Sequence, residues 1–200
     1  MLHFLLLVAS DVPLATFDGR APHSWQTEND PVMGGQSNGK WSTTTIANKT
    51  YGEWTGECKI VPALKAPGFT IALTKSPLTA KFPDVHDQDG LLITAKNLGN
   101  VSTFNVAFCD SRINFYRCQF GSFKANFSMP VSDYFSTVFV PWGHFSDKWS
   151  SATGKHTKED PPTAASLSKI SQVQVWVEGV AGKFHVLLEG ISAGKAPIQS

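Results

Sequence analysis

The sequence has no excess of charge of either sign. Its 17 lysines and arginines nearly balance 16 aspartates and glutamates, which gives a formal net charge of +1 over 200 residues, of which 16% are charged. Proteins that bind nucleic acid or anionic membranes electrostatically carry a basic patch or stripe. The sequence contains no such run, so we expect no nucleic-acid partner.

Long apolar runs are also missing. A helix needs about 20 apolar residues to cross a bilayer. Residues 1–9, MLHFLLLVA, fall far short of that length, so no transmembrane segment is predicted. With the small Ser10 after it, this run resembles the apolar core and cleavage zone of a secretory signal peptide, although it lacks lysine and arginine. The alternative is a buried first strand that continues into residues 13–17. Residues 1–14 are therefore either a signal or targeting segment or a first strand.

The sequence has only three cysteines and no Cys-x-x-Cys spacing, so a redox or zinc site of that kind is not supported. Cys109 and Cys118 flank residues 110–117. If the chain reverses symmetrically there, the two cysteines lie opposite each other and a disulfide is geometrically acceptable. In a reducing compartment all three cysteines would remain thiols. Cys58 is expected to be a buried thiol.

Catalytic motifs are scarce as well. The sequence has no His-Glu-x-x-His zinc motif, and Gly34-Gly35 lacks the Lys-Ser or the third glycine of a phosphate-binding loop. Glu28 and Asp30 cannot be assigned as an acid and base pair, because the sequence does not say what faces them. We therefore expect a binding or assembly protein and not an enzyme, with no catalytic residue assigned.

What the sequence does contain is an alternation of apolar and polar residues with a period of two, which is typical of half-buried strands. The residues expected to face the core are Trp54, Gly56, Cys58 and Ile60; Phe69, Ile71 and Leu73; Phe104, Val106 and Phe108; Phe123, Ala125 and Phe127; Val173, Val175 and Val177; and Phe184, Val186 and Leu188. About ten such strands, separated by turn signals, predict an all-β sandwich with very little helix. Residues 15–193 are assigned to one domain, residues 194–200 to a C-terminal tail, and residues 146–162 to a long mobile loop.

Residues 25–39 show no strand or helix periodicity, and we predict that they form an ordered loop around which the chain is organised. Gly34 and Gly35 allow a positive φ or a close backbone approach, while Asp30 precedes a proline and favours an extended backbone. The loop is either a well-tied connection, anchored by apolar side chains such as Met33, or a binding site. In the second case its binding residues are Trp25, Asn29, Asp30, Met33, Gly34, Gly35, Gln36, Ser37 and Asn38.

This loop also carries a family resemblance. The positions concerned are Trp25, Asn29, Asp30, Val32, Met33, Gly34, Gly35 and Ser37. They resemble the signature of the thirty-kilodalton complex I intermediate-associated protein family. Further segments are similar to other parts of that family and follow in the same order, namely Thr16–Asp18, Pro67–Phe69, Phe139–Phe145 and Gly182–Ile191. Together they span residues 15–193.

The resemblance implies a galactose-binding-domain-like jelly roll of two antiparallel sheets that acts as an assembly factor or chaperone. The best-known member helps to build mitochondrial respiratory complex I, and related domains occur in plastid-associated proteins. The implied partners are protein subunits of a membrane complex during its assembly, and the implied location is a mitochondrion or plastid. The N-terminus looks more like a secretory signal than a mitochondrial one, which leaves the compartment open. A second segment would supply exposed anchors for the partner at Pro141, Trp142, Phe145 and Trp149.

The alternative function is that of a secreted or organellar carbohydrate-binding module on the same fold. The tryptophans that could stack on sugar rings in that case are Trp41, Trp54, Trp142 and Trp149. An aromatic row on a concave face together with a calcium site would favour a sugar. A flat apolar patch would favour a protein partner.

Two further features concern modification and metal binding. N-glycosylation sequons occur at three asparagines, Asn48, Asn100 and Asn126. Oxygen and imidazole ligands are concentrated in one turn, at Asp84, His86, Asp87 and Asp89. The turn lacks the spacing of a calcium loop, so we interpret it as solvated and predict no cofactor, with a structural calcium as the alternative.

Overall fold

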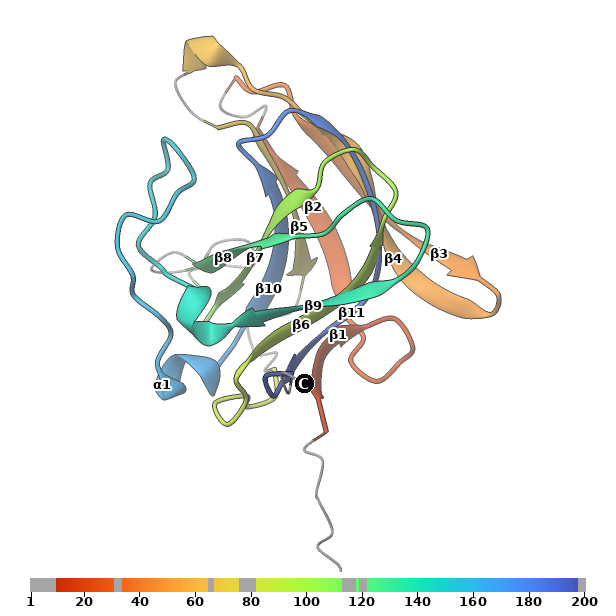
Figure 1. Cartoon of the computed structure of the whole chain (residues 1–200), viewed down its shortest axis with the longest axis vertical. Coiled ribbons are helices and arrows are strands. Elements are labelled where there is room, and N and C mark those ends of the chain that lie inside the picture. The colour runs from red at the N-terminus through yellow and green to blue at the C-terminus, as the bar shows by residue number, and fades with distance from the viewer. Residues whose placement is uncertain are drawn as a thin grey trace, which may run out of the picture.

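The computed structural model describes residues 10–30, 34–64, 67–75, 82–112, 118 and 122–197. Two antiparallel sheets face each other and enclose the main hydrophobic core (Figure 1). This is the all-β sandwich that the alternation predicts, in the jelly-roll form that the resemblance implies.

The two sheets have six and five strands. The six-stranded sheet contains, in spatial order, β3 (Asn38–Ile46), β4 (Lys49–Cys58), β11 (Gly182–Gly194), β6 (Gly90–Asn97) and β9 (Ser136–Pro141), and β1 (Val12–Thr16) also pairs with β11. The five-stranded sheet contains β2 (Ser24–Asn29), β5 (Phe69–Lys75), β10 (Gln172–Glu178), β7 (Thr103–Cys109) and β8 (Phe123–Ser128). The last two strands of the chain therefore lie in the middle of the two sheets.

Helix in the described ranges consists of α1 (Ala164–Leu167), the two 3-10 turns η2 (Pro62–Leu64) and η3 (Trp142–His144), and the 3-10 conformation of Asp30. The side chain of Thr163 caps α1 by accepting a hydrogen bond from the backbone N–H of Ser166 at 3.2 Å. The predicted scarcity of helix is confirmed. No helix in these ranges is long and apolar enough to cross a bilayer.

The core between the sheets is built largely from the residues that the alternation assigns to it. Phe104, Val106 and Phe108 of β7 and the three valines of β10 are at most 5% exposed. Ile60 differs from the prediction, because it lies beyond the end of β4 and is 46% exposed.

Strand β5 faces the opposite way from the prediction. Ile71 pairs with Trp176, and Ile71, Leu73 and Trp176 belong to a second hydrophobic cluster that is separate from the main core. The main core instead receives Ala72 of β5. Both faces of this strand are buried, so its apolar residues do not mark the core side. The second cluster lies on the outer face of the five-stranded sheet and supports the candidate site described below.

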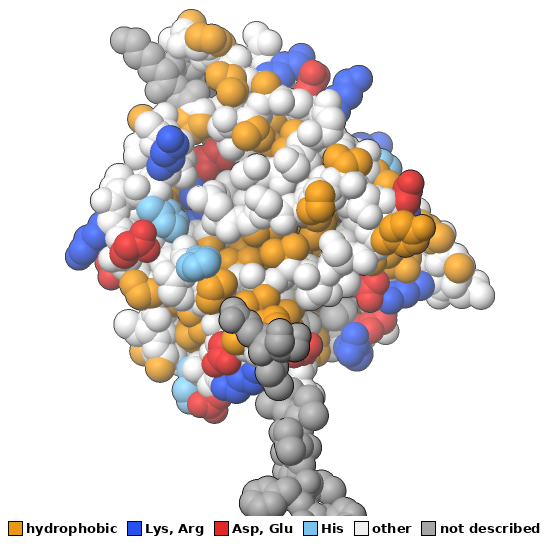
Figure 2. Space-filling model, viewed as in Figure 1, with side chains coloured by type: hydrophobic (Ala, Val, Ile, Leu, Met, Phe, Trp, Pro, Cys, Tyr) orange, Lys and Arg blue, Asp and Glu red, His pale blue; other side chains and the backbone are white. Residues whose placement is uncertain are grey.

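The surface agrees with the balanced composition. In the view of Figure 2, acidic and basic side chains are interspersed around the periphery. Hydrophobic side chains gather in a band across the middle of the same face, near the place where strands β8 and β9 approach each other in Figure 1.

The cysteines divide into a bridged pair and one thiol. Cys109 and Cys118 form a disulfide, with their Cα atoms 5.5 Å apart. Cys58 is unpaired and fully buried, and burial raises the pKa of its thiol above the usual value of 9.0. The disulfide ties the end of β7 to residue 118, shortly before β8 begins.

The ends of the predicted domain are only partly covered by the structure. Strand β1 begins at Val12 and pairs with β11, which runs to Gly194. Residues 1–9, to which a signal segment or a first strand was assigned, and residues 198–200 of the tail lie outside the described residues.

His23 is expected to make stability depend on pH. Its ring stacks on that of Phe82, with centroids 4.5 Å apart, and burial lowers its pKa below the usual 6.5 against the opposing hydrogen bond with the Leu14 backbone. As pH falls below about 6.5, His23 binds a proton in the unfolded chain but stays neutral in the folded chain. The contribution of His23 to the free energy of unfolding is therefore complete above that pH and declines below it. Urea unfolding at pH values on both sides of 6.5 measures the slope, and His23→Phe should flatten it. An unchanged slope in the variant would contradict the assignment.

Candidate functional site

The prediction that residues 25–39 form one loop is wrong at both ends, because strand β2 runs to Asn29 and strand β3 begins at Asn38, which leaves residues 30–37 as the connection. We keep the name signature loop for residues 25–39. It is organised around the carboxylate of Asp30, which is 4% exposed. Its Oδ1 accepts a hydrogen bond from the backbone N–H of Ser37 at 2.9 Å, and its Oδ2 accepts one from Ser37 Oγ at 2.8 Å. Asp30 Oδ2 also accepts the backbone N–H of Phe69 at 3.0 Å. One side chain therefore joins the two ends of the connection between β2 and β3 to the start of β5.

The two glycines of the loop are required for different reasons. Gly34 has φ of +82°, which disfavours other residues, so the expectation of a special backbone conformation is confirmed. Gly35 lies so close to Asp30 that an added Cβ would be 2.1 Å from its Cγ. Asp30 therefore fits only beside a residue without a side chain.

The remaining loop residues mostly attach the loop to the sandwich. Trp25 stacks on Trp41 with ring centroids 4.5 Å apart, and Asn29 Nδ2 donates to Gly39 O at 3.3 Å. Gln36 and Asn38 are exposed. Met33 lies outside the described residues. Most of the described loop residues thus have structural contacts, and an outward-facing row of anchors is not formed.

Residues 35–39 also fit the Gly-x-Ser-x-Gly spacing of a hydrolase nucleophile. The central Ser37 is 1% exposed and its hydroxyl donates to Asp30. It immediately precedes strand β3 and does not lie on a strand-to-helix turn. The geometry therefore does not present Ser37 as a nucleophile.

The second predicted segment divides into buried and accessible residues. Trp142 is 9% exposed and Phe145 is fully buried, and both belong to the main core. The indole N–H of Trp142 donates to Gln88 O at 2.8 Å. The prediction that these two residues are exposed anchors is therefore wrong, because the turn η3 points its aromatic residues inward. Half-buried Pro141 ends strand β9.

Trp149 is different, because it lies half-buried against the second cluster on the outer face of the five-stranded sheet. Its ring meets that of Trp176 edge to face at a centroid distance of 6.0 Å. On the other side of Trp176, the ring of Phe69 lies at 5.9 Å. Phe69, Trp176 and Trp149 thus form an aromatic row that crosses from β5 over β10 to the loop after η3.

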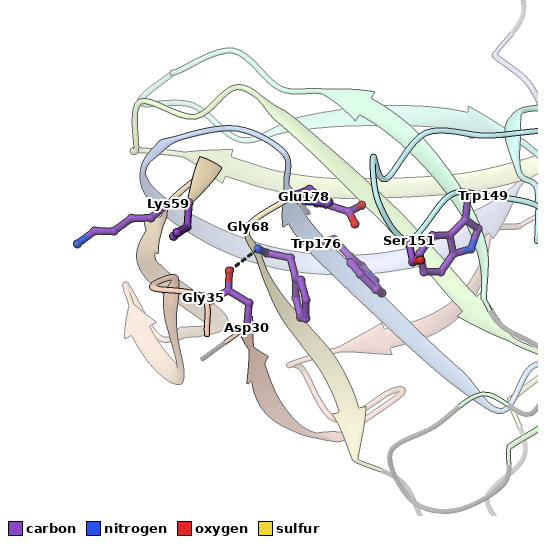
Figure 3. A pocket seen from close by; sticks show the side chains of 11 residues that line it. Asp30, Gly35, Lys59, Gly68, Trp149, Ser151, Trp176 and Glu178 are labelled. Atoms are coloured by element: carbon purple, nitrogen blue, oxygen red, sulfur yellow. Dashed lines mark hydrogen bonds between the residues drawn. The ribbon is translucent and has the colours of Figure 1, made fainter. Parts of the chain in front are cut away.

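The aromatic row forms one side of a pocket of about 230 Å³, which we call the tryptophan pocket (Figure 3). Its lining residues come from separate parts of the chain, namely Asp30, Gly35, Lys59, Val61, Pro67, Gly68, Phe69, Trp149, Ser151, Trp176 and Glu178. Two predicted binding segments therefore meet here, because Asp30 and Gly35 come from the signature loop and Trp149 from the second segment. The side chain of Lys59 points away from the pocket in Figure 3.

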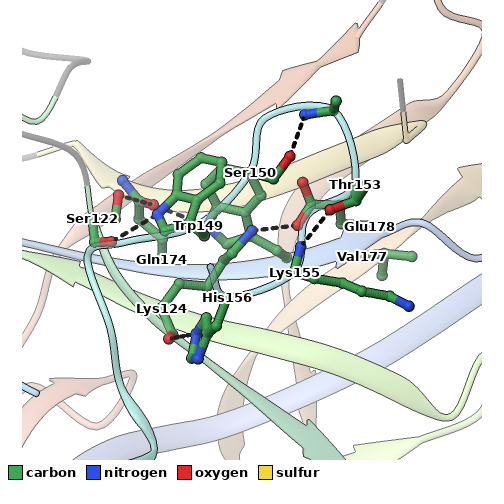
Figure 4. Close-up of polar contacts among 12 residues, drawn as sticks. Ser122, Lys124, Trp149, Ser150, Thr153, Lys155, His156, Gln174, Val177 and Glu178 are labelled. Carbon is green, nitrogen blue, oxygen red and sulfur yellow. Dashed lines mark hydrogen bonds and ion pairs between the residues drawn. The ribbon is translucent and has the colours of Figure 1, made fainter. Parts of the chain in front are cut away.

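A buried ion pair lies beneath Trp149 (Figure 4). Lys124 Nζ is 2.5 Å from Glu178 Oε2, and the two side chains are 1% and 5% exposed. The ammonium also lies 3.9 Å from the centroid of the Trp149 ring and 5.0 Å from that of Trp176, which adds cation–π attraction. Burial lowers the pKa of Lys124, and the Glu178 carboxylate opposes this effect.

Residues 146–162, predicted to be a mobile loop, are attached to the backbone of Lys124 at two points. The backbone of Ser146 pairs with that of Lys124, and His156 Nε2 lies 2.6 Å from Lys124 O. Trp149 and His156 form an isolated bridge with each other. The segment therefore folds back on itself above Lys124 and holds Trp149 against the pocket.

The indole N–H groups of both tryptophans are satisfied away from the pocket. Trp176 Nε1 donates to Gln174 Oε1 at 2.9 Å, and Trp149 Nε1 donates to Ser122 O at 3.1 Å. Gln174 Nε2 in turn lies 3.7 Å from Cys118 Sγ of the disulfide. The rings are thus oriented by a polar network behind them and leave their apolar surfaces for the pocket.

The other candidate residues do not form a site. Asp84 and Asp87 contact the His86 ring at 2.8 and 3.2 Å, and Asp89 accepts a hydrogen bond from Ala196 N. Among the residues that the structure describes, no group of three or more His, Cys, Asp or Glu side chains is placed to hold a metal ion. The three sequon asparagines are exposed. Of the remaining tryptophans proposed for sugar stacking, Trp54 is 1% exposed and Trp41 is stacked on Trp25.

The fold is similar to that of carbohydrate-binding modules. The family 11 module from Clostridium thermocellum in complex with a beta-1,3-1,4-mixed-linked tetrasaccharide is 14% identical with a TM-score of 0.61, over 93% of this chain and 96% of that chain. The family 11 module of cellulosomal cellulase Lic26A-Cel5E of Clostridium thermocellum is 14% identical with a TM-score of 0.59, over 95% of this chain and 98% of that one. The agarase AgWH50C is 13% identical with a TM-score of 0.54, over 95% of this chain and 25% of the agarase. At such identities the similarity shows the fold alone.

Sequence comparison points to a family. No curated protein sequence matches the chain significantly. The family model of complex I intermediate-associated protein 30 (CIA30) matches residues 15–188. The matched range contains the signature loop and every residue that lines the tryptophan pocket. The chain therefore belongs to the complex I intermediate-associated protein 30 family.

Proposed function

We propose that the chain is a non-catalytic binding protein of the assembly-factor type, which holds a segment of a partner protein in the tryptophan pocket. The observation that carries this proposal is the pocket itself, where three aromatic rings and the apolar residues Val61 and Pro67 surround about 230 Å³. Interfaces draw most of their binding energy from a few residues in such well-packed pockets, which are rich in tryptophan. Membership of the family supports a protein as the partner.

The signature loop then acts as a support for the site. Asp30 and Gly35 line the pocket, and the hydrogen bond from Phe69 N to Asp30 fixes the start of the strand that carries one wall. The carboxylate of Asp30 is engaged in hydrogen bonds within the protein and is not available to a ligand. This explains how the signature can be essential to binding without offering exposed anchors.

The absence of catalysis is part of the proposal. The carboxylate of Asp30 accepts three hydrogen bonds from its own chain, and Glu178 is paired with Lys124. The hydroxyl beside Asp30 belongs to Ser37, which is 1% exposed, and the nearby thiol of Cys58 is fully buried, so neither group is presented to a substrate. Both carboxylates are better suited to fixing the shape of the pocket than to transferring protons.

Photo-crosslinking tests the site. A crosslinking side chain at Ser151, which is exposed at the pocket, should capture a defined segment of one partner protein in an extract of the native cells. Trp149→Ala should lower the yield by about tenfold, because a pocket wall is removed. The crosslinked peptides are identified by mass spectrometry, and thermal unfolding shows that the variant is folded.

The matched control is the double variant Gln36→Ala/Asn38→Ala. Both residues are exposed on the signature loop, so stability should change by no more than about 0.5 kcal/mol, and capture should be unaffected. Loss of capture in this control, with normal capture by Trp149→Ala, would move the binding site to the outer side of the loop and contradict the proposal.

Carbohydrate binding is the second candidate function. It is favoured by one feature of the site, the presence of two tryptophans beside the carboxylate of Glu178, because aromatic rings and carboxylates can bind the C–H faces and hydroxyls of sugars. A panel of immobilised glycans tests it. Retention that Trp149→Ala abolishes would favour a sugar ligand over a partner protein.

A further inference from the structure

We propose that the tryptophan pocket selects one kind of side chain from its partner, an aromatic ring that carries a hydrogen-bond donor, which means tryptophan or tyrosine. This inference rests on the proposed function, since it names the chemistry of the segment that the pocket holds. It is carried by an acceptor atom inside the pocket that the protein does not satisfy.

The acceptor is Glu178 Oε1. The side chain of Glu178 is only 5% exposed, and its Oε2 atom receives Lys124 Nζ. No hydrogen bond from a described residue to its Oε1 atom is found, and solvent reaches this atom, since it is not among the fully buried side-chain atoms that lack a partner. Figure 3 shows the carboxylate directed toward the part of the pocket between Trp176 and Ser151. A nearly buried carboxylate oxygen gains about 1.5–3 kcal/mol from a well-placed donor, so a ligand that supplies one is favoured.

The aromatic walls of the pocket favour a ligand that carries an aromatic ring. Phe69 and Trp176 meet at an interplanar angle of 40°, and Trp176 and Trp149 at 76°. Tilted and edge-to-face arrangements of this kind are the ones that aromatic rings prefer, so a further ring can extend the row. A volume of about 230 Å³ has room for a group as large as an indole.

The donor should be neutral. Lys124 already balances the charge of Glu178, and its ammonium lies near both tryptophan rings, at 3.9 and 5.0 Å from their centroids. A second ammonium or guanidinium would therefore face Lys124 across a poorly hydrated space, where like charges repel strongly. An indole N–H or a phenol O–H gives the hydrogen bond without that repulsion.

A sugar ring fits this chemistry less well. A pyranose has several hydroxyls, and those facing the aromatic walls would lose water without gaining partners, at about 1–3 kcal/mol each. Of the other polar side chains at the pocket, Asp30 is occupied by Ser37 and Phe69, and Lys59 points away. Glu178 Oε1 and the exposed hydroxyl of Ser151 are thus the polar side-chain groups that remain at the pocket, too few for the several hydroxyls of a pyranose.

Titration with short blocked peptides tests the inference. The probes are acetyl-Gly-Trp-Gly-amide, the tyrosine and phenylalanine peptides of the same length, and methyl β-glucoside. The nuclear magnetic resonance signals of the indole N–H groups of Trp149 and Trp176 report binding. We expect the tryptophan and tyrosine peptides to bind about tenfold more tightly than the phenylalanine peptide, which lacks the donor.

The matched variant is Lys124→Met/Glu178→Leu, which removes the acceptor and its counter-ion together and keeps apolar side chains of similar size. It should bind all three aromatic peptides equally. Glu178→Gln, which keeps the shape of the carboxylate, should also reduce the preference. Equal binding of the phenylalanine peptide by the unmodified protein, a shift with the glucoside alone, or no shift up to the solubility limit of the peptides would each overturn the inference.

The outcome is separable from that of the proposed function. Pocket-dependent capture of a partner without a preference for the donor would overturn the ligand assignment alone. Peptide binding with the expected preference, combined with partner capture that ignores Trp149→Ala, would overturn the proposed function alone.

Discussion

Replacing Lys124 by alanine is expected to lower the free energy of unfolding by about 3–5 kcal/mol. The substitution leaves Glu178 with 5% exposure and without the ammonium that pairs with it at 2.5 Å. It also removes the cation beneath the Trp149 ring, at 3.9 Å from the centroid. Urea unfolding followed by circular dichroism measures the change.

Two controls test whether the loss of stability comes from breaking the buried ion pair or from removing any lysine charge. Lys148 pairs with Asp147 at 2.9 Å but is 49% exposed, so Lys148→Ala should change stability by no more than about 1 kcal/mol. Lys124→Met/Glu178→Leu should recover most of the stability lost in Lys124→Ala, because a well-packed apolar pair can replace a buried ion pair. If Lys124→Ala were as stable as Lys148→Ala, the expected cost of leaving Glu178 buried without its partner would be contradicted.

Gly35→Ala is expected to destabilise the protein by about 3 kcal/mol. The new Cβ would be 2.1 Å from Asp30 Cγ, and the carboxylate is 4% exposed and has little room to move. Displacing it weakens the hydrogen bonds to Ser37 N, Ser37 Oγ and Phe69 N together. The expected result is a loss of stability accompanied by weaker ligand binding, since Phe69 carries one wall of the pocket. Thermal and urea unfolding measure the first effect.

Gly143→Ala is the matched control for this substitution. Its added Cβ would meet no atom within 4 Å, and Gly143 has no positive φ, so stability should stay within about 0.5 kcal/mol of the unmodified protein. Gly34→Ala should also destabilise the protein, by about 1 kcal/mol, because its φ of +82° disfavours a residue with a side chain. If Gly35→Ala unfolded at the same temperature as Gly143→Ala, the close approach to Asp30 would not matter for the fold.

Alternation predicted the core side of β7 correctly. Phe104, Val106 and Phe108 lie in the main core as expected, and the residues between them are the polar Asn105 and the small Ala107, which belongs to the second cluster. The same reasoning failed for β5. Its core-facing positions include Thr70 and Thr74, while its larger apolar residues serve the second cluster. Which face of a doubly buried strand meets the core depends on strands that are distant in sequence, and local pattern does not contain that information.

The candidate site was predicted only in part. The signature loop and Trp149 were identified from local composition, and both contribute to the pocket. Lys124, Trp176 and Glu178 were missed, because β8, β10 and the loop after η3 meet only in the folded chain. One signal was available, since Trp176 stands at a position of its strand where the alternation calls for a polar residue. A large aromatic residue on the polar face of a strand is therefore a useful indicator of a second apolar surface.

The origin of the pocket walls has a consequence for the synthesis of the protein. The walls come from residues as far apart in the sequence as Asp30 and Glu178, so the first part of the site leaves the ribosome long before the last. Strand β10 lies between two pairs of strands made earlier, β2 with β5 and β7 with β8, and the facing edges of β5 and β7 have no partner until β10 is made. A nascent chain therefore exposes Phe69 and the second cluster without a functional pocket. If the pocket holds a partner as proposed, binding can begin only after β10 has been made.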